Sequence, residues 1–348
     1  LADQNGTTTI TVTVTDGGLD NDLATSGDNA TTSHTFDVTV NPVNDDPTLN
    51  SLADLTIDEN SSQKTVNLSG ITAGENEQQP LRVTASSSSP GTFAVATNFA
   101  VGSFPGSVSV ADFNGDGNQD LATANNSSGN VSILLGDGSG SFAAATNFAA
   151  GLLSGFVSAA DFNGDGNQDL VVTNDTPSNT VSILLGDGSG SFVAPTTFAV
   201  GLRPFSVSVA DFNGDGIQDL GVANHSDDNL SILLGNGDGT FAAATSFAAN
   251  DQPVSVSVAD FNGDGNQDLA TANFLSNNVS ILLGDGSGSF TAATNFAVGM
   301  NPRELSVADI DGDGIQDLAV ANFADDTVSI LLGDGSGSFA AATNFAAG

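Results

Sequence analysis

One ten-residue motif, DFNGDGNQDL, returns along this chain at a nearly fixed interval. It begins at Asp112, Asp161 and Asp260, with DFNGDGIQDL at Asp211 and DIDGDGIQDL at Asp309, so that consecutive starts are 49, 50, 49 and 49 residues apart. A fixed period in this range is the signature of a repeat architecture, in which each unit packs on its neighbours. The repeat constrains the fold more than any other feature of the 348 residues.

Each repeat, from about residue 91 onward, predicts four short strands. In the first repeat we expect them at 107–113, 120–124, 130–135 and 141–149, separated by the Asp-rich loop and by a tight Gly-rich turn, GDGSG. Short strands bounded by turn residues favour an all-β fold, and four antiparallel strands in such a unit make one blade of a β-propeller. Residues 91–348 therefore predict a propeller with five visible blades, and the number that closes the ring stays open.

Residues 1–90 have a different pattern, rich in Thr and poor in aromatic residues. Two segments, 9–15 and 34–40, alternate cleanly between polar and apolar residues, which predicts strands with one buried face. Shorter strands are expected at 55–57, 65–68 and 81–84. This pattern is typical of an Ig-like β-sandwich, although five strands are too few for a seven-stranded one.

The charge balance is extreme, with four Lys and Arg against 41 Asp and Glu and a formal net charge of −37. Proteins bind nucleic acids by neutralising phosphates with Lys and Arg, so nucleic acid is not an expected partner. No apolar run approaches the roughly 18 residues of a membrane span, and membrane insertion is not expected either. A solvated acidic surface would account for part of the charge. However, 16 of the acidic residues are Asp in the five motifs, which makes cations the natural partners.

The nine-residue loop DxNGDGxxD has the spacing of a calcium site. Positions 1, 3, 5 and 9 supply side-chain oxygens and position 7 a backbone carbonyl, while Gly at positions 4 and 6 permits a sharp turn. Hard oxygen ligands in a flexible loop suit calcium better than magnesium or zinc. We therefore expect about five calcium ions, one in each loop. The candidate ligands are Asp112, Asn114, Asp116, Asn118 and Asp120; Asp161, Asn163, Asp165, Asn167 and Asp169; Asp211, Asn213, Asp215, Ile217 and Asp219; Asp260, Asn262, Asp264, Asn266 and Asp268; and Asp309, Asp311, Asp313, Ile315 and Asp317.

The alternative for each loop is a turn without metal, because Asp-Gly and Asn-Gly steps favour turns by themselves. Five copies of the loop that each gather three or four carboxylates favour a metal site over a metal-free turn. The loop is not an EF-hand, since Thr123 and Val172 stand where a bidentate Glu would be required. In the fifth loop Asp311 replaces Asn, and the extra negative charge predicts the tightest calcium binding.

The stretch SVSVADFNGDGNQDLATAN, followed by NVSILLGDGSGSF, resembles the FG-GAP/VCBS repeat of integrin alpha-chain propellers and of many secreted bacterial proteins. The resemblance covers about 91–348. It implies calcium bound between the first two strands of each blade and an extracellular or cell-surface location. Propellers of this family commonly have seven blades, from which the five repeats here depart.

The N-terminal segments TVTVTDGG, TFDVTVNPVNDDPTL and LTIDENSSQKTVNLSGI resemble bacterial cadherin-like adhesin repeats. Residues 1–46 resemble the end of one such repeat and 47–90 the start of the next. The resemblance makes Asp45, Asp46 and Glu59 weaker calcium-ligand candidates, although Asp-Pro connectors are common without metal. The two halves could join in permuted order within one chain. Alternatively, a second copy could supply the missing strands by head-to-tail strand addition.

The sequence gives little support to an enzyme. His34 and His225 are the only histidines, and His225 is expected in a solvated surface loop; neither is accompanied by a nucleophile elbow. GDGSGS lacks the Lys of a phosphate-binding loop. The expected function is a calcium-stabilised structural or adhesive segment of a surface adhesin or filament. The alternative is a lectin-like or protein-binding recognition module for a cell-surface glycan or protein. The absence of Trp and Tyr disfavours the glycan, and the 22 Phe recur at core positions.

Overall fold

A computed structural model describes residues 7–15, 31–39, 84–86 and 96–347. The chain divides into two compact units, Leu1–Thr97 and Asn98–Gly348. In the first, β1 (Thr7–Thr15), β2 (Thr31–Thr39) and β3 (Thr84–Ser86) form an antiparallel sheet in that order. The strands predicted at 9–15 and 34–40 are thereby confirmed within three residues at each end.

Several N-terminal predictions are not addressed by this sheet. The third strand lies at 84–86, where 81–84 was predicted, and shares only Thr84 with that range. The predicted strands at 55–57 and 65–68 lie outside the described residues, as do Asp45, Asp46 and Glu59. The β-sandwich, its division at residue 46 and its growth by strand addition remain predictions.

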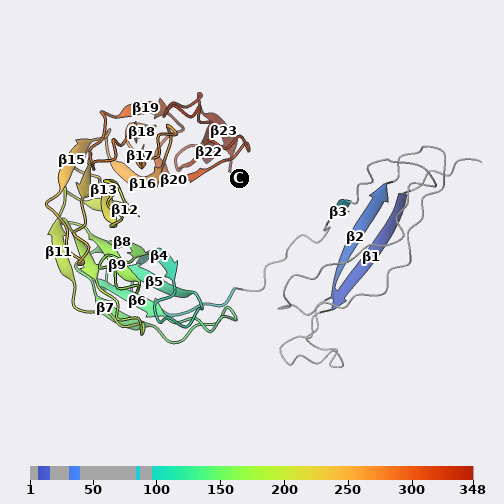
Figure 1. The fold of residues 1–348 in the computed structure, drawn as a ribbon, viewed down its shortest axis with the longest axis horizontal. Coiled ribbons are helices and arrows are strands. Elements are labelled where there is room, and N and C mark those ends of the chain that lie inside the picture. The colour runs from blue at the N-terminus through green and yellow to red at the C-terminus, as the bar shows by residue number, and fades with distance from the viewer. Residues whose placement is uncertain (1–6, 16–30, 40–83, 87–95, 348) are drawn as a thin grey trace, which may run out of the picture. The chain divides into compact units, whose positions relative to one another are not determined.

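The second unit consists of five four-stranded antiparallel sheets, which we call blades 1 to 5 (Figure 1). In each blade the strands pair in sequence order. The residues described contain no helix, so the all-β prediction is confirmed, and none of them forms a helix that could span a membrane. The strands are β4 (Pro105–Ala111), β5 (Asp120–Asn125), β6 (Asn130–Leu134) and β7 (Thr146–Ala149) in blade 1; β8 (Ser154–Ala160), β9 (Asp169–Asn174), β10 (Thr180–Leu184) and β11 (Thr196–Ala199) in blade 2; β12 (Pro204–Ala210), β13 (Asp219–Asn224), β14 (Asn229–Leu233) and β15 (Thr245–Ala248) in blade 3; β16 (Pro253–Ala259), β17 (Asp268–Asn273), β18 (Asn278–Leu282) and β19 (Thr294–Ala297) in blade 4; and β20 (Pro302–Ala308), β21 (Asp317–Asn322), β22 (Thr327–Leu331) and β23 (Thr343–Ala346) in blade 5.

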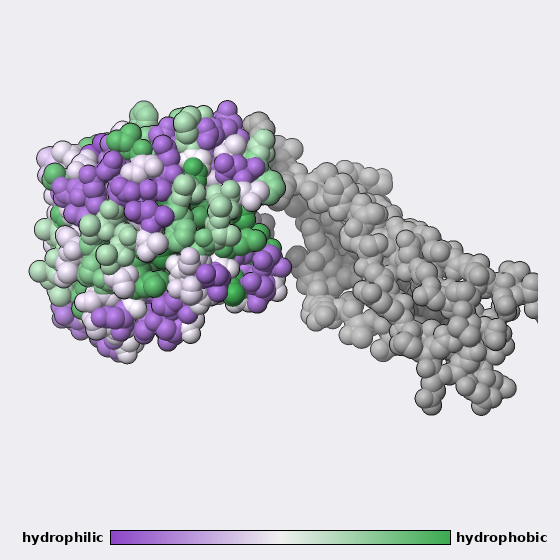
Figure 2. All heavy atoms as spheres, turned by 90° about the horizontal axis from the view of Figure 1, so that it is seen from above, coloured by the Kyte–Doolittle hydropathy of each residue, from purple (hydrophilic) through white to green (hydrophobic). Residues whose placement is uncertain are grey.

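The outer strand of each blade is shorter than the sequence predicts. In blade 1 the predicted strand 141–149 is reduced to β7, and Phe142 makes only an isolated bridge to Gly136 that closes the GDGSG turn. Residues 143–145, between the bridge and the strand, are not part of a strand, although the Ala143 N–H still donates to the Leu135 carbonyl at 2.8 Å; Ala143 and Ala144 are exposed. Figure 2 shows hydrophobic residues across the middle of the described surface, with hydrophilic residues toward its upper and lower ends.

We call the face of a blade on the side of the next blade its forward face, and the opposite face its rear face; where two blades are neighbours, the forward face of one packs on the rear face of the other. Between blades 1 and 2, the forward face contributes Phe113, Ala124 and Ile133, and the rear face contributes Val157 and Leu170. The equivalent apolar residues pack together at the other three interfaces, although Thr173 stands at the position of Ala124 in blade 2. The apolar core of this unit therefore lies mainly between the blades.

The first strands of successive blades, β4, β8, β12, β16 and β20, contact one another in that order. Figure 1 shows the five blades following one another around an arc. Among the described strands, β4 and β20 have no comparable contact. Within residues 96–347, four blade interfaces are therefore formed, and blades 1 and 5 each have one face without a neighbouring blade.

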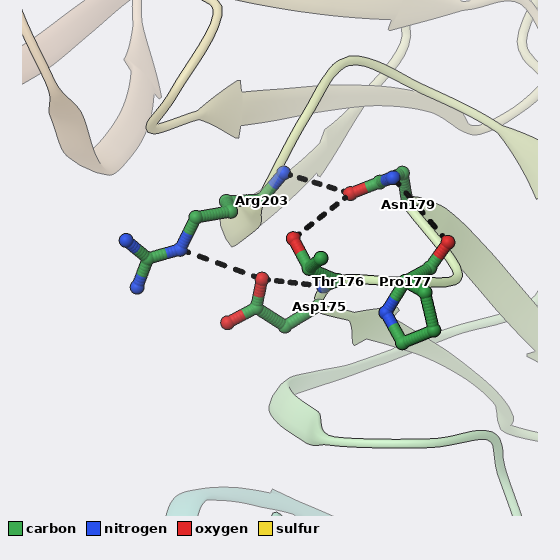
Figure 3. A network of polar contacts seen from close by, with 5 residues as sticks. All are labelled: Asp175, Thr176, Pro177, Asn179 and Arg203. Carbon is green, nitrogen blue, oxygen red and sulfur yellow. Dashed lines mark hydrogen bonds and ion pairs between the residues drawn. The ribbon is translucent and has the colours of Figure 1, made fainter.

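Polar contacts also join neighbouring blades, and Figure 3 shows one set between blades 2 and 3. The Arg203 N–H donates to Asn179 Oδ1 at 3.1 Å, and the Arg203 guanidinium lies 3.5 Å from the Asp175 carboxylate. The hydrogen bond from the backbone N–H to the side-chain oxygen recurs at the next two interfaces. There the Gln252 N–H donates to Asp228 Oδ1 and the Asn301 N–H donates to Asn277 Oδ1. Exposed ion pairs contribute little to stability. The recurring hydrogen bond is therefore better evidence than the ion pair of how neighbouring blades are joined.

Candidate metal centre

The five Asp-rich loops lie between the first and second strands of the blades, as the family resemblance implies. Gly115 and Gly117, at positions 4 and 6 of the first loop, have φ angles of 71° and 87°. Residues with a Cβ rarely adopt this left-handed region, which is why Gly stands at both positions. The other four loops repeat the pair of positive φ angles.

The carboxylate at position 1 shapes the loop. In the first loop, Asp112 Oδ1 accepts the Gly115 N–H at 2.7 Å and Oδ2 accepts the Gly117 N–H at 2.8 Å. Corresponding bonds are made by Asp161, Asp211, Asp260 and Asp309. The carboxylate at position 1 is therefore held in one place in every blade.

The side chain at position 3 has the same orientation whether it is Asn or Asp. Asn114 Oδ1 accepts the Asp116 N–H at 3.0 Å, and Asp311 Oδ1 accepts the Asp313 N–H at 3.1 Å. In the first loop the Asn114 amide also donates to Asp116 Oδ2 at 3.0 Å. Position 3 therefore presents an oxygen on the same side of each loop, as an amide in four blades and as a carboxylate in blade 5.

The aspartate at position 9 is fully buried, which the sequence did not predict. Asp120 Oδ2 accepts the Phe113 N–H at 2.9 Å, and Oδ1 accepts the Gly136 N–H at 2.7 Å. The same pair of bonds recurs in the other four blades. This residue therefore fastens the loop to the tight turn between the third and fourth strands, besides being a candidate ligand.

The acidic groups of a loop differ in how readily they ionise. Burial raises the pKa of Asp169, Asp219 and Asp268 at position 9, and the negative charges at positions 5 and 1 raise it further. At position 5, the N–H of Asn118 is the main cause that lowers the pKa of Asp116. A cation held among these groups would offset the repulsion between the buried carboxylate and its neighbours.

The fifth loop brings three carboxylates to one point. Asp309, Asp311 and Asp317 each place one oxygen within 4.8 Å of the other two, and no other such acidic group occurs in the part of the chain that the structure describes. Two oxygens that each lie about 2.4 Å from one calcium ion are at most about 4.8 Å apart. The oxygens at positions 1, 3 and 9 of the fifth loop therefore lie within the limit for ligands of one calcium ion. Asp313, at position 5, is not part of this group.

The loop also takes part in the contact with the next blade. The Phe113 side chain, at position 2, is buried in the interface, and its carbonyl accepts the Gly190 N–H of blade 2 at 2.9 Å. Phe162, Phe212 and Phe261 accept the corresponding bonds from Gly239, Gly288 and Gly337. The loop conformation and the packing between blades are therefore linked through one residue.

Two other candidate sites have a structural explanation. The Asp137 carboxylate of GDGSGS accepts hydrogen bonds from the Ser139 N–H and hydroxyl at 2.8 and 2.7 Å, which confirms the predicted turn. His225 is half-buried where a solvated position was predicted, because its ring stacks on Phe205 with the centroids 5.8 Å apart. Burial lowers the pKa of His225. Neither place brings together the groups of a catalytic site.

Comparison with solved structures finds the same fold at low identity. A functionally unknown protein from Desulfotomaculum acetoxidans is 13% identical, with a TM-score of 0.55 over 71% of this chain and 72% of that one. A protein from Lactobacillus plantarum is 11% identical, with a TM-score of 0.55 over 76% and 75%. No curated protein matches the sequence.

The sequence itself matches the FG-GAP-like repeat at residues 112–172, 161–222, 211–271 and 260–320, which together span more than half of the chain. Each match begins at one Asp-rich loop and ends in the second strand of the following blade, so it contains one blade interface. The chain belongs to the FG-GAP-like repeat family.

Proposed function

We propose that the protein is a calcium-stabilised structural component of an extracellular or cell-surface adhesive assembly, in which one calcium ion in each blade loop stiffens the array. Its role is to hold a shape rather than to carry out a reaction. The repeats of one family, the five similar blades and the net charge of −37 support this function. Calcium-rich surroundings outside the cell would supply the ion.

The convergence of Asp309, Asp311 and Asp317 is the observation that carries the proposal. Positions 1, 3 and 9 would hold the ion in every loop, since the backbone bonds that place them recur in each blade. Bound calcium would supply positive charge at a point where a buried carboxylate meets two others. The residues of the chain hold the oxygens in place and connect the loop to the adjacent turn and blade.

The fifth loop is expected to bind calcium most tightly, because its three converging groups carry one charge more than those of the other loops. The substitution Asp311→Asn gives this loop the same ligand types as the other four. The variant is expected to lose the tightest binding step, with affinity at that loop falling at least tenfold, or about 1.4 kcal/mol. Isothermal titration with calcium measures the change.

A matched control tests whether the effect belongs to the fifth loop. Asp334→Asn also removes one carboxylate from blade 5, but from the tight turn GDGSGS, where Asp334 accepts bonds from Ser336. This variant should retain the tightest step. If Asp311→Asn leaves that step unchanged, the assignment of the fifth loop is wrong. If the unaltered chain takes up no calcium, the calcium role itself fails.

A further inference from the structure

The first four Asp-rich loops carry an Asn–Gly pair at positions 3 and 4, where the fifth loop carries Asp–Gly. The pairs are Asn114 with Gly115, Asn163 with Gly164, Asn213 with Gly214 and Asn262 with Gly263. In such a pair the glycine nitrogen can attack the side-chain Cγ atom of the asparagine, because glycine has no Cβ to obstruct the approach. The four asparagines are half-buried and the four glycines are exposed, so water reaches each pair. The loops therefore contain the reactants of a deamidation.

The attacking nitrogen of each pair is in contact with a carboxylate. In the first loop, the Gly115 N–H donates to Asp112 Oδ1 at 2.7 Å. The N–H groups of Gly164, Gly214 and Gly263 donate to the position 1 carboxylates of their own loops at the same distance. A carboxylate placed in this way can accept the proton when the nitrogen attacks, which is the role of a general base.

The asparagine carboxamide is held at both of its polar atoms. Asn114 Oδ1 accepts the Asp116 N–H at 3.0 Å, and Asn114 Nδ2 donates to Asp116 Oδ2 at 3.0 Å. The first bond closes an Asx-turn, which folds the side chain back over the Gly115 peptide group. It also places an N–H at the oxygen on which negative charge develops during the attack, as in an oxyanion hole. Equivalent pairs of bonds hold Asn163, Asn213 and Asn262.

Another Asn–Gly pair among the described residues, Asn236 with Gly237, lacks these contacts. It lies in the tight turn of blade 3, where the Asn236 amide donates to Thr240 Oγ1 at 2.9 Å and the asparagine is exposed. Within residues 96–347, the Gly237 N–H donates no hydrogen bond and Asn236 Oδ1 accepts none. The same two residues therefore occur in one molecule with and without the neighbouring base and the N–H donor.

We propose that Asn114, Asn163, Asn213 and Asn262 are sites of spontaneous deamidation that the fold of the loop promotes. The glycine nitrogen forms a bond to Cγ and gives up its proton to the position 1 carboxylate. The Cγ–Nδ2 bond then breaks, and the amide nitrogen takes up this proton and leaves as ammonia. A water molecule opens the resulting cyclic succinimide, at one carbonyl to give aspartate and at the other to give isoaspartate. The net reaction consumes water, releases ammonia and needs no cofactor.

The aspartate product gives a loop the same three carboxylates as the fifth loop. There Asp311 already occupies position 3, with an oxygen within 4.8 Å of those of Asp309 and Asp317. Each deamidated loop would therefore gain one negative charge, and ligand charge is one determinant of calcium affinity. This consequence rests on the proposed function, whereas the deamidation itself does not. The isoaspartate product instead lengthens the main chain of the loop by one carbon atom and moves the position 3 oxygen.

Peptide mapping by mass spectrometry tests the proposal on the unaltered full chain. The chain is incubated with a chelator, so that the rates do not depend on calcium, and conversion of amide to acid is followed with both products counted together. The four loop asparagines should deamidate at least tenfold faster than Asn236, since a positioned acid–base group typically contributes about 10²–10⁴-fold. In concentrated urea the difference should disappear, because the base and the N–H donor are then no longer held in place.

Two reciprocal variants test the carboxylate at position 1. Asp112→Asn should slow deamidation of Asn114 at least tenfold and leave Asn163 unchanged, and Asp161→Asn should do the reverse. In each variant the unaltered loops report whether the array is folded. Loop rates no higher than that of Asn236 contradict the proposal, and so does a difference that persists in urea, which would belong to the sequence alone. Unchanged rates in both variants exclude the proton transfer. A chain that binds no calcium would keep these rates, so the two proposals fail separately.

Discussion

Chelation of calcium is expected to lower the melting temperature of the blade array by at least about 5–10 °C. A ligand that binds only the folded state stabilises it by about 2.7 kcal/mol when its concentration is a hundred times its dissociation constant. For a unit of this size, 1 kcal/mol corresponds to roughly 2–4 °C, so a single occupied loop accounts for about 5–10 °C by itself. Differential scanning calorimetry in millimolar calcium and after addition of a chelator measures the shift.

Magnesium at the same concentration provides the control for this measurement. It requires nearly octahedral coordination at short distances, so it should restore little of the lost stability. Full restoration by magnesium would indicate that general charge screening, and not a calcium site, holds the loops together. An unchanged melting temperature after chelation would exclude a stabilising role for calcium.

Phe212→Ala is expected to be the most damaging single substitution of a core residue. The Phe212 side chain is 1% exposed, and its ring packs edge-on against Phe290 across the interface between blades 3 and 4, at 5.4 Å. Truncating a buried Phe to Ala typically costs about 3–5 kcal/mol. Because the array contains several similar units, unfolding need not be two-state, and the shift of the main urea transition is the appropriate measure.

The chain contains its own control for Phe212→Ala. Ile310 stands at the same loop position in blade 5 and is 44% exposed. Surface substitutions of this kind usually change stability by less than about 0.5 kcal/mol, so Ile310→Ala should leave the transition nearly in place. Comparable losses from both substitutions would mean that blade 5 is covered in solution at the concentration used. Dilution should then restore the difference between the urea transitions of the two variants.

The blade array could be predicted from the sequence because its signals repeat. The 49-residue period, the turn residues and the alternation within SVSVADF place three of the four strands of blade 1 within two residues of their observed ends. The outer strand was predicted too long, since an alanine run has no alternation that would show where pairing stops. The Asp-rich loops were located correctly because the motif that defines the repeat is the loop itself.

Other features of the candidate site have no signature in residue type. The role of Asp120 in joining the loop to the turn depends on two backbone N–H groups 7 and 16 residues away. The residue before each first strand has a positive φ angle, from 53° to 59° in all five blades, yet it is Phe104, Leu153, Arg203, Gln252 or Asn301. Left-handed backbone at a non-Gly residue persists only where the surrounding contacts impose it. Such positions follow from the folded repeat and cannot be predicted from the side chains.

The identical pairing of forward and rear faces also bears on how an array of this kind changes length in evolution. Because each blade carries both faces, an in-register duplication of one 49-residue unit adds one blade and one interface of the same kind. Deletion of a unit reverses this without creating a mismatched contact. Lengthening or shortening the array therefore needs no compensating substitution in its core, which is consistent with the near-identity of the five loops.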